Sequence, residues 1–290
     1  MRGIGRYFLE IVLVLLLVFC AGIWTAVYAQ TPSGRLKVAI LDVGQGDSIY
    51  IESPTGQEIL IDGGPDNSVL RELPKVMPSF DQSLDAVIET HPHADHTEGL
   101  IDLFKRYSIG AFIESDVEYP NPQSKTVEQE VLDEHIPRYI ARRGMVIDIG
   151  GGVVIDILYP DYDVTHLPEA KVHEGMLVAR LTYGNTSVLL MGDAPQDVEN
   201  HLLNISSSTE LKSDILKVGH HGSRTSSNDA FIAAVHPTEA VISVGAHNMY
   251  KLPNQEPIDT LKKYGAEVLR TDQDGTVEFE SDGVTFTRIR

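Results

Sequence analysis

The sequence predicts an α/β protein in which two β-sheets pack face to face with helices on their outer sides, a four-layer αββα arrangement. Three observations lead to this prediction. The chain has 290 residues, of which 42% are hydrophobic and 22% charged, as in an ordinary globular protein with a sizeable core. Strand-like apolar runs open each half of the chain, and they then alternate with segments of helical periodicity. One apolar segment precedes this region at the N-terminus.

The first half of the chain opens with short strands joined by tight turns. The apolar run Leu36–Leu41 predicts the first strand, and Pro54-Thr55-Gly56 predicts a hairpin turn between the second and third. Further runs rich in Val, Ile and Leu predict the other strands of this half: Ser48–Glu52, Glu58–Ile61, Leu84–Glu89 and Ala111–Glu114. Apolar residues at helical spacing predict two helices, Val69–Val76 and Thr97–Tyr107.

A longer amphipathic helix is predicted at Thr126–Arg143. Its apolar residues recur on one side at helical spacing: Val127, Val131, Ile136 and Ile140. Gly144 follows, and glycine commonly stands where a helix ends.

The second half repeats the strand-rich style. Its predicted strands are Met145–Ile149, Val153–Tyr159, Met176–Tyr183, Ser187–Met191, Ile215–Val218, Ala240–Val244 and Val268–Arg270, with a final hairpin within Thr276–Arg290. Its predicted helices are Pro195–Asn204, Asn228–Val235 and Glu256–Tyr264. The loop Asp161–Lys171 is the least structured stretch, and we expect it near a cleft.

Residues 1–30 are interpreted as a targeting segment. Arg2 and Arg6 form a short cationic region, and the apolar run Tyr7–Tyr28 is long enough to cross a bilayer about 30 Å thick. The segment is either a cleaved signal peptide or a retained N-terminal membrane anchor, and residues 7–28 then contact the membrane. Both alternatives predict export to an extracellular, periplasmic or membrane-anchored location. Residues 31–35 are a predicted linker, and residues 36–290 a single domain without internal repeats.

Charge and cysteine content exclude several kinds of protein. The chain has 42 acidic and 23 basic residues, a net charge of −19. The first thirty residues carry a net +1 from Arg2, Arg6 and Glu10, so the remainder carries −20. Such a surface repels phosphate backbones, and we therefore expect no tight binding of duplex nucleic acid. The single cysteine, Cys20, excludes an intrachain disulfide and a multi-cysteine zinc site, so any metal must be held by histidines and carboxylates.

Metal-binding residue types are concentrated in the segment from His91 to His96, directly after a predicted strand. His91 and His93 are separated by one residue, so in an extended segment both rings face the same side and can share one ion. Asp95 and His96 lie where the next helix begins, within reach of a second ion. Imidazole and carboxylate donors together suit zinc, and manganese or iron are alternatives. Accidental clustering on a polar loop is disfavoured, because five of the eleven histidines fall in two short clusters.

Two later segments can complete a ligand set. Asp193 follows a strand in Met191-Gly192-Asp193, and His220 and His221 follow another in Lys217–Ser223. Taken singly, a Gly-Asp pair is usually a turn and a His pair is often a buried structural pair. Together the three segments place six donors at strand ends, where layered α/β folds gather their site residues. Asp47 and Asp62 are interpreted as residues that support a ligand histidine from behind.

The pattern His-x-His-x-Asp-His resembles the signature of the metallo-β-lactamase superfamily. More narrowly, Leu41–Ser48, Ile61-Asp62-Gly63-Gly64, Gly192-Asp193 and Lys217–Ser223 are similar to the hydrolase domain of ComEC-type competence proteins, over about residues 36–280. Phosphorylcholine esterase is a more distant relative. The resemblance implies a metallo-β-lactamase-like αββα sandwich that holds one or two divalent ions, zinc foremost and manganese as the alternative.

The resemblance also implies roles for individual residues. His91 and His93 would hold one ion, Asp95 and His96 the other, and Asp193 would bridge the two. His221 is the histidine that aligns with the remaining metal ligand, which leaves His220 as a neighbour available to a substrate phosphate.

The sequence departs from the family pattern at two places. The metal-binding histidine that many members carry between the first motif and the Gly-Asp pair has no evident counterpart, and His166 and His173 are the candidates in that region. The ComEC-like group often carries histidines after an Asn-x-Tyr near the C-terminus, but here Asn248–Asn254 contains none. This second difference puts a substrate-contacting role at that place in doubt.

We therefore expect an exported metal-dependent hydrolase, a phosphodiesterase or nuclease of ComEC-like type that uses a metal-bridged hydroxide. Asp95 and Asp193 would orient that hydroxide, and His220 would steady the substrate oxyanion. The substrate is expected to be a phosphodiester or another ester. The alternatives are a catalytically degenerate metal-binding surface module and a hydrolase of another ester, thioester or lactam. The sequence leaves the oligomeric state open.

Overall fold

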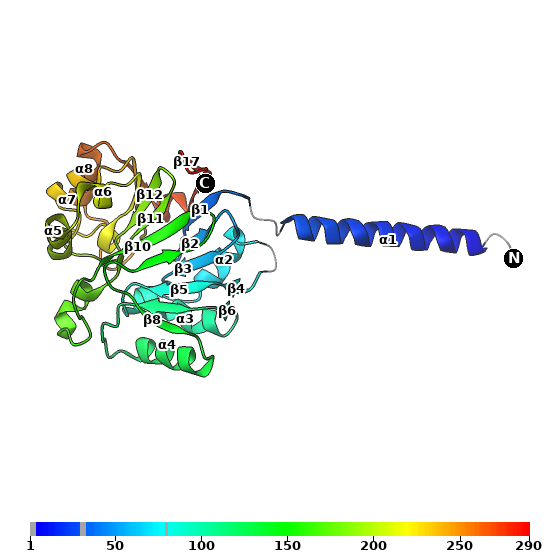
Figure 1. Ribbon diagram of the computed structural model, residues 1–290, viewed down its shortest axis with the longest axis horizontal. Coiled ribbons are helices and arrows are strands. Elements are labelled where there is room, and N and C mark those ends of the chain that lie inside the picture. The colour runs from blue at the N-terminus through cyan, green and yellow to red at the C-terminus, as the bar shows by residue number, and fades with distance from the viewer. Residues whose placement is uncertain (1–3, 30–32, 79–80) are drawn as a thin grey trace.

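The computed structural model describes residues 4–29, 33–78 and 81–290, and its two large sheets face each other with helices outside both (Figure 1). The predicted fold class is therefore confirmed. The first sheet has the strand order β17 (Phe286–Arg288), β16 (Val277–Ser281), β1 (Leu36–Ile40), β2 (Ile49–Glu52), β3 (Glu58–Ile61), β5 (Ala86–Glu89), β7 (Phe112–Glu114) and β8 (Arg138–Ile140). The second has the order β15 (Glu267–Arg270), β14 (Glu239–Ile242), β13 (Ile215–Lys217), β12 (Thr186–Leu190), β11 (Val178–Tyr183), β10 (Val153–Tyr159) and β9 (Val146–Asp148). A short pair joins β4 (Ser83–Leu84) to β6 (Ser108–Ile109).

Helices cover the outer face of each sheet. On the first sheet these are α2 (Val69–Val76), α3 (Ala94–Phe104) and α4 (Pro122–Asp133). On the second they are α5 (Gln196–Ile205), α6 (Ser208–Leu211), α7 (Asp229–Val235) and α8 (Gln255–Lys263), and α9 (Thr271–Asp274) follows β15. The short 3-10 segments η1 (Glu169–Gly175) and η2 (Gly219–Gly222) precede β11 and follow β13.

The main core lies between the two sheets. In β1, Leu36, Val38 and Ile40 face the opposite sheet, where they join Leu181 and Ile215 in one buried cluster. The intervening residues of β1 face the outer helices instead, because successive strand residues point to opposite sides. Both faces of each sheet are thus buried, which explains why the strands read as continuous apolar runs.

The predicted helix at Thr126–Arg143 is wrong in its second half. The structure places α4 at Pro122–Asp133 and makes Arg138–Ile140 the strand β8, which pairs with β7 in parallel. Pro137 is the physical reason: it lacks an N–H group, and its ring disfavours helical backbone at the preceding Ile136. Ile136 and Ile140 therefore match the helical spacing by chance, because they lie beyond the end of α4.

Two sets of parallel strands position the candidate site. The strands β3, β5 and β7 run parallel in the first sheet, and β12, β13, β14 and β15 run parallel in the second. The carboxyl ends of parallel strands lie at the same edge of a sheet. The segments that follow β5, β12 and β13 carry all the predicted site residues, so the fold brings distant parts of the chain to one place.

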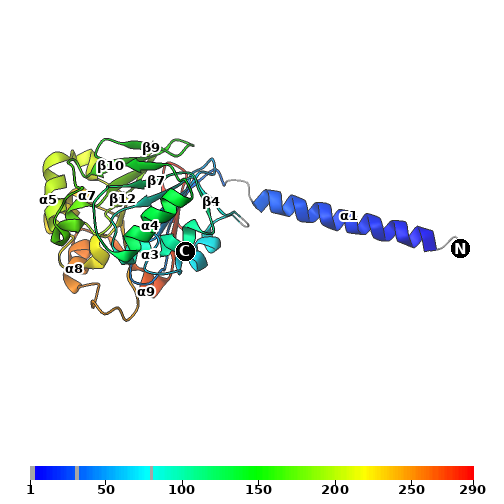
Figure 2. The same cartoon turned by 90° about the horizontal axis from the view of Figure 1, so that it is seen from below.

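The N-terminal helix α1 (Ile4–Ala29) extends away from the sandwich in both views (Figure 1, Figure 2). Its segment Tyr7–Trp24 has a mean hydropathy of 2.5, none of it is buried, and it is long and apolar enough to cross a membrane. The signal-peptide boundary before Gln30, and Thr31 and Pro32 of the predicted linker, lie outside the described residues. The domain boundaries at residues 30 and 35 stay predictions.

Candidate metal centre

The segment after β5 supplies three histidines, of which His91 and His96 are buried and His93 is half-buried. Thr90 donates from its backbone N–H and its hydroxyl to the Asp62 carboxylate, both at 2.7 Å, which fixes the chain where β5 ends. His93 is extended and immediately precedes α3. The rings of His91 and His93 lie 4.6 Å apart between centroids, on the same side of the segment as predicted. His96 lies in the first turn of α3 and is fully buried.

Asp193 lies between two groups of imidazoles. Its Oδ1 is 3.4 Å from His96 Nε2 and 3.3 Å from His221 Nε2. Its Oδ2 is 4.0 Å from His91 Nε2 and 3.9 Å from His220 Nε2. Each oxygen of one buried carboxylate therefore faces a different group of nitrogens.

All seven residues singled out from the sequence come together at this place. Together with His173, their donor atoms form overlapping groups that could each hold a metal ion: His91, His93 and His173; Asp95, His96, Asp193 and His221; and His173, Asp193 and His220. The second group includes a contact of 3.4 Å between Asp95 Oδ2 and His221 Nε2.

His173 is the residue that sequence reasoning did not resolve. Its Nε2 lies 2.9 Å from His93 Nδ1, which places it with His91 and His93 in a group of three imidazoles that could hold an ion. His166, the other candidate, is exposed and lies 3.5 Å from Glu118 instead. His173 belongs to η1, and no predicted strand or glycine motif precedes it in the sequence. Only its position between the His91–His96 segment and Gly192-Asp193 could have indicated a ligand role.

The donor set fits divalent metal ions. Four atoms that point into the centre are buried and have no hydrogen-bond partner: His91 Nε2, His96 Nε2, His221 Nε2 and Asp193 Oδ1. Leaving such atoms unpaired is costly unless something else satisfies them. The 3.3–3.4 Å between neighbouring donors also matches the edge of a tetrahedron around an ion with ligand distances of roughly 2.0–2.1 Å.

Two imidazoles are oriented from behind. His96 Nδ1 lies 2.7 Å from Asp62 Oδ2, and His221 Nδ1 donates to the Ser243 carbonyl at 2.9 Å. Because Nδ1 is used in this way, Nε2 of each ring is left facing Asp193. Asp47 Oδ1 lies 3.5 Å from His221 Nδ1. Asp47 and Asp62 thus stand where supporting residues were expected.

The loop that carries Asp47 reaches the centre through Gly46. A Cβ atom at this glycine would lie 1.9 Å from the Asp95 carbonyl oxygen, so no larger residue fits without moving the backbone of the site.

The sequence model of the Metallo-beta-lactamase superfamily matches residues 41–247. The chain belongs to this superfamily. The match confirms the family predicted from the His-x-His-x-Asp-His pattern, and membership implies a metal-dependent hydrolase family that uses divalent ions.

The curated relatives include proteins named for competence and for recombination. The chain is 30% identical to ComE operon protein 3 of Bacillus subtilis (strain 168), over 85% of this chain and 33% of the relative. It is 28% identical to Competence protein ComA of Neisseria gonorrhoeae, over 89% of this chain and 34% of the relative. It is 29% identical to Recombination protein 2 of Haemophilus influenzae, over 86% and 29%. The chain thus spans about a third of the length of these relatives.

Solved structures show the same fold at low sequence identity. The metallo-beta-lactamase fold protein YhfI from Bacillus subtilis has a TM-score of 0.55 and 17% identity, covering 85% of this chain and 99% of that one. The metallo hydrolase Igni18 from Ignicoccus hospitalis has a TM-score of 0.55 and 16% identity, covering 85% and 100%.

The charges in the candidate metal centre favour the binding of positively charged ligands. Burial opposes ionisation of Asp193, but His221 and His96 outweigh it and hold the pKa of this carboxyl well below its usual range. Burial also opposes the charge on His221, yet Asp193 and Asp95 raise its pKa to about 10. Burial dominates at His173 and lowers its pKa to about 4, which keeps its lone pair free to bind a metal. Protons and divalent cations therefore compete for this centre.

Two of the pockets in the described part of the fold bear on the predicted site. One, of about 560 Å³, opens beside the centre and is lined by His93, His173, Tyr119 and Glu169 among others. Because His93 and His173 line this pocket, a substrate group bound there would lie against two candidate ligands.

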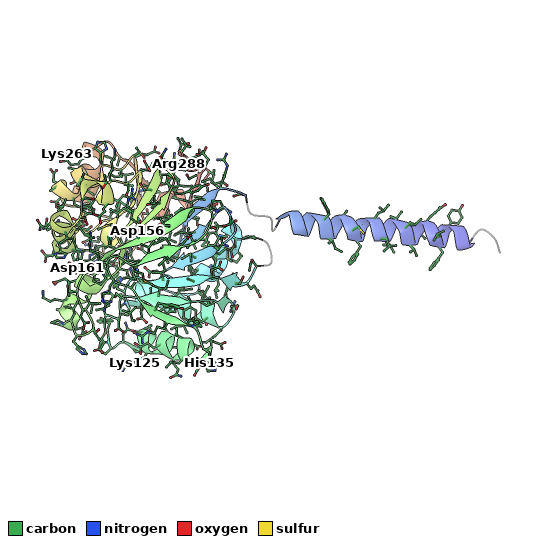
Figure 3. The ribbon with its side chains drawn as sticks, viewed as in Figure 1. Lys125, His135, Asp156, Asp161, Lys263 and Arg288 are labelled. Atoms are coloured by element: carbon green, nitrogen blue, oxygen red, sulfur yellow. The ribbon has the colours of Figure 1, made fainter. Side chains whose placement is uncertain are left out.

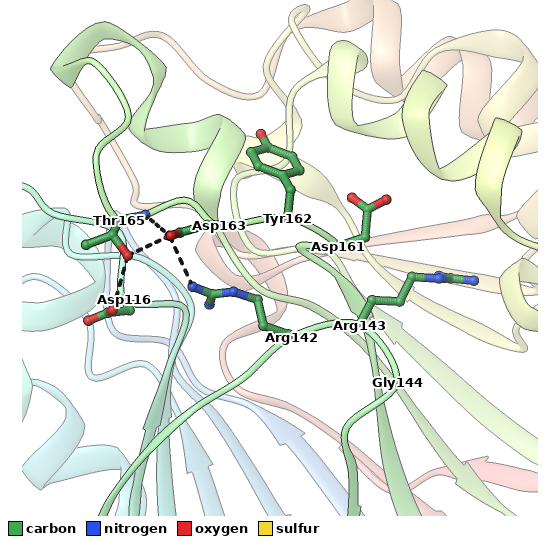
Figure 4. A pocket seen from close by; sticks show the side chains of 8 residues that line it. All are labelled: Asp116, Arg142, Arg143, Gly144, Asp161, Tyr162, Asp163 and Thr165. Carbon is green, nitrogen blue, oxygen red and sulfur yellow. Dashed lines mark hydrogen bonds and ion pairs between the residues drawn. The ribbon is translucent and has the colours of Figure 1, made fainter.

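The other pocket, of about 810 Å³, is lined by Arg142, Arg143 and the loop that starts at Asp161 (Figure 4). Both guanidinium groups are already engaged: Arg142 by Asp163 and backbone carbonyls, and Arg143 by Glu210 and backbone carbonyls. The predicted loop does border a cleft, but among the described residues none that line it belongs to a candidate metal-binding group, and both of its arginines are already paired.

Proposed function

We propose that this protein is an exported metal-dependent phosphodiesterase that works with two divalent ions. The observation that carries the proposal is the position of Asp193, whose two oxygens face separate groups of buried imidazoles. A carboxylate in that position is suited to bridge two ions, as expected for two-metal hydrolysis of phosphate esters.

The residues divide into two ligand groups around Asp193. His91, His93 and His173 would hold one ion, and Asp95, His96 and His221 the other. The five imidazole nitrogens in the combined set favour zinc over manganese, which prefers oxygen donors. When bound, the ions supply Lewis acidity that polarises a phosphoryl oxygen and lowers the pKa of water.

The protein's own side chains would then position the reactants. The Asp95 carboxylate, 31% exposed, is placed to accept a hydrogen bond from an attacking water, and Asp193 fixes the opposite side. His220 is 26% exposed, and its Nδ1 lies 3.1 Å from Thr225 Oγ1, which leaves Nε2 toward the centre. Because His173 completes the three-imidazole group, His220 is available to contact a substrate oxyanion.

The substrate class rests on two further observations. The curated relatives are named for competence and recombination, which favours a nucleic-acid phosphodiester among the ester substrates. The net charge of −19 disfavours tight binding of a duplex, so short single strands or small diesters fit better. The apolar helix α1 supports export, with α1 either cleaved or kept as an anchor.

The test is metal analysis of the purified full-length protein, combined with an activity panel. The panel contains bis(p-nitrophenyl) phosphate, a single-stranded oligonucleotide and a phosphocholine ester. We expect two ions per chain and turnover of the first two substrates that chelation abolishes. His93→Ala should lose turnover, whereas the exposed His166→Ala should keep it. Full turnover by His93→Ala would refute the mechanism.

A second candidate is a metal-binding surface module without turnover. The absence of histidine from Asn248–Asn254 favours it, since related hydrolases often carry histidine there. In that case the protein would bind its ions but hydrolyse none of the panel. Hydrolysis of a thioester or lactam instead would keep the metal centre and change only the substrate class.

A further inference from the structure

The loop 245–254, between β14 and α8, presents an unusual tip. Met249 is 83% exposed and Tyr250 63% exposed, although both are large and apolar in part. Single exposed apolar residues are ordinary, but two adjacent ones at a loop tip beside a reactive centre require an explanation.

The loop is held in shape by its own hydrogen bonds. The Asn248 side chain donates to the carbonyls of Gly245 (2.9 Å) and Leu252 (2.7 Å) and accepts from the Leu252 backbone N–H (3.0 Å). The exposed tip is therefore preorganised, and binding a ligand there would cost little conformational entropy.

Both ends of the loop are attached to the metal centre. At one end, Gly245 packs so closely on Gln45 that a Cβ atom on Gly245 would lie 2.7 Å from the Gln45 backbone nitrogen. The next residue, Gly46, is the glycine that packs against the Asp95 carbonyl. At the other end, Asn254 donates to the Gly222 carbonyl at 2.9 Å and accepts from the Arg224 N–H at 2.8 Å. Gly222 directly follows His221, so the loop spans the His221 side of the site.

Two cations accompany the exposed tip. Lys251 follows Tyr250 and is held in the left-handed region at φ +58°, and Arg224 lies on the turn that carries His220 and His221. Both side chains are exposed, and within the described residues neither forms an ion pair. These two unpaired cations are therefore available to an anionic ligand.

The pocket on the other side of the centre has a different character. Beside His93 and His173 it offers Tyr119 and Glu169, and no lysine or arginine lines it. The adjoining pocket on this side has one lysine, Lys125, among three glutamates. A substrate that continues as a chain of phosphates is therefore favoured on the Arg224 side over the more acidic Glu169 side.

We propose that Tyr250, Lys251 and Arg224 form a subsite for single-stranded nucleic acid that extends from the scissile phosphodiester. Tyr250 stacks on a base, and the two cations contact the phosphates that follow it. This inference rests on the proposed function, since it names the substrate class of the same centre. The Met249 side chain adds apolar contact at the edge of the stacked base.

The test measures binding rather than turnover. The full-length protein in detergent is titrated into a fluorescent phosphorothioate oligothymidylate of roughly 12 nucleotides, which resists hydrolysis, and anisotropy is followed at several salt concentrations. Tyr250→Ala should weaken binding by about 5- to 100-fold. Arg224→Ala with Lys251→Ala should lower the salt dependence of log K by roughly 0.7 for each cation removed.

Matched controls remove the same residue types elsewhere. Tyr139, 50% exposed on the edge strand β8, and Lys212, exposed before the opposite end of β13, should bind like the parent protein after change to alanine. Thermal unfolding checks that every variant is folded. If Tyr250→Ala binds as the parent does, as it would if the tip contacts a lipid surface, the subsite is refuted.

The result separates this inference from the proposed function. Binding that depends on Tyr250, without turnover of any diester, supports the subsite and refutes the phosphodiesterase. Turnover of bis(p-nitrophenyl) phosphate, with oligonucleotide binding that ignores all three residues, refutes only the subsite.

Discussion

Lys217 and Asp47 form a fully buried ion pair behind the metal centre, with Lys217 Nζ 2.6 Å from Asp47 Oδ2 and side-chain exposures of 0% and 2%. Lys217 also donates to the Val218 carbonyl at 2.9 Å. Since Asp47 lies 3.5 Å from the His221 ring, the pair fixes the loop before β2 against the end of β13, and with it one imidazole of the site. The buried charge of Lys217 is neutralised by Asp47, and Asp47 in turn lies against the His221 ring.

Removing the cation should destabilise the protein strongly. Lys217→Met leaves Asp47 buried and unpaired, which typically costs about 3–5 kcal/mol of unfolding free energy. The double variant Asp47→Asn with Lys217→Met should recover part of that loss, because it removes both charges. Lys263→Met is the control, because it breaks an exposed ion pair with Asp229 and should leave the unfolding free energy nearly unchanged. Chemical denaturation measures all three, and equal losses for Lys217→Met and Lys263→Met would contradict the interpretation.

His173 should be required for metal binding. His173→Ala removes one imidazole of the His91 and His93 group and should leave the other group intact, so metal analysis should find about one ion per chain instead of two. His166→Ala changes an exposed histidine outside the centre and serves as the control. An unchanged metal content in His173→Ala would exclude it from the ligand set.

Much of this site could be predicted from the sequence, and the exceptions have physical causes. The residues from His91 to His96, Asp193 and His221 lie in short motifs directly after apolar strands, and strand ends are the places that a layered fold brings together. His173 has no such context, since a 3-10 segment carries no periodic pattern. Its place depends on Tyr159, whose hydroxyl hydrogen-bonds to the Glu174 carbonyl, and such a tertiary contact cannot be predicted from local sequence.

The fold class was also predicted correctly, and the error in the helix predicted after Thr126 has a physical cause as well. Apolar spacing alone extended the helix after Thr126 as far as Arg143, whereas Pro137 within it forbids a regular helix. The strand β8 forms there because the edge of β7 offers hydrogen-bond partners. When a proline interrupts a segment with helical apolar spacing, the proline is therefore the better guide to where the helix ends.

Chelation should destabilise the folded protein. Bound ions would satisfy the unpaired histidine nitrogens and the Asp193 carboxylate, so removal of the ions should lower the melting temperature. An ion present at a thousand times its Kd contributes about 4 kcal/mol. Differential scanning calorimetry with and without EDTA measures the effect, and excess zinc should restore it. The Asp193→Ala variant should show little response to either addition.

Glu58 should make stability depend on pH at a place remote from the metal. Burial, together with nearby Asp81, Glu52 and Asp85, raises the pKa of Glu58 to about 7, although Tyr50 donates a hydrogen bond to it at 2.6 Å. Because the folded pKa exceeds the unfolded one, the stability from this group is complete below about pH 4.5 and is lost as pH rises through 7.

Glu58→Gln should remove this dependence. The variant should match the parent near pH 4.5 and exceed it by about 2 kcal/mol at pH 8, since the amide oxygen can still accept from Tyr50. Glu134→Gln, at the exposed end of α4, should follow the parent at every pH. Urea denaturation from pH 4.5 to 8 gives the comparison, and a parent that gains stability over this range relative to Glu58→Gln would contradict the sign.

Charged residues elsewhere on the sandwich surface provide background controls for the binding experiments. Lys125, Lys263 and Arg288 lie at the periphery of the sandwich (Figure 3). Lys263 and Arg288 are already paired with Asp229 and Glu267. Changing Lys125, Lys263 or Arg288 to alanine should leave both metal content and oligonucleotide affinity unaltered. Changing Arg224 and Lys251 to alanine should instead weaken oligonucleotide binding.

Anomalous X-ray scattering at the zinc edge, from crystals of the zinc-loaded protein, tests the central claim most directly. Two peaks should lie on opposite sides of the Asp193 carboxylate, one bound by His91, His93 and His173 and the other by Asp95, His96 and His221. A single peak, or peaks that Asp193 does not contact, would contradict a two-ion centre built around this carboxylate.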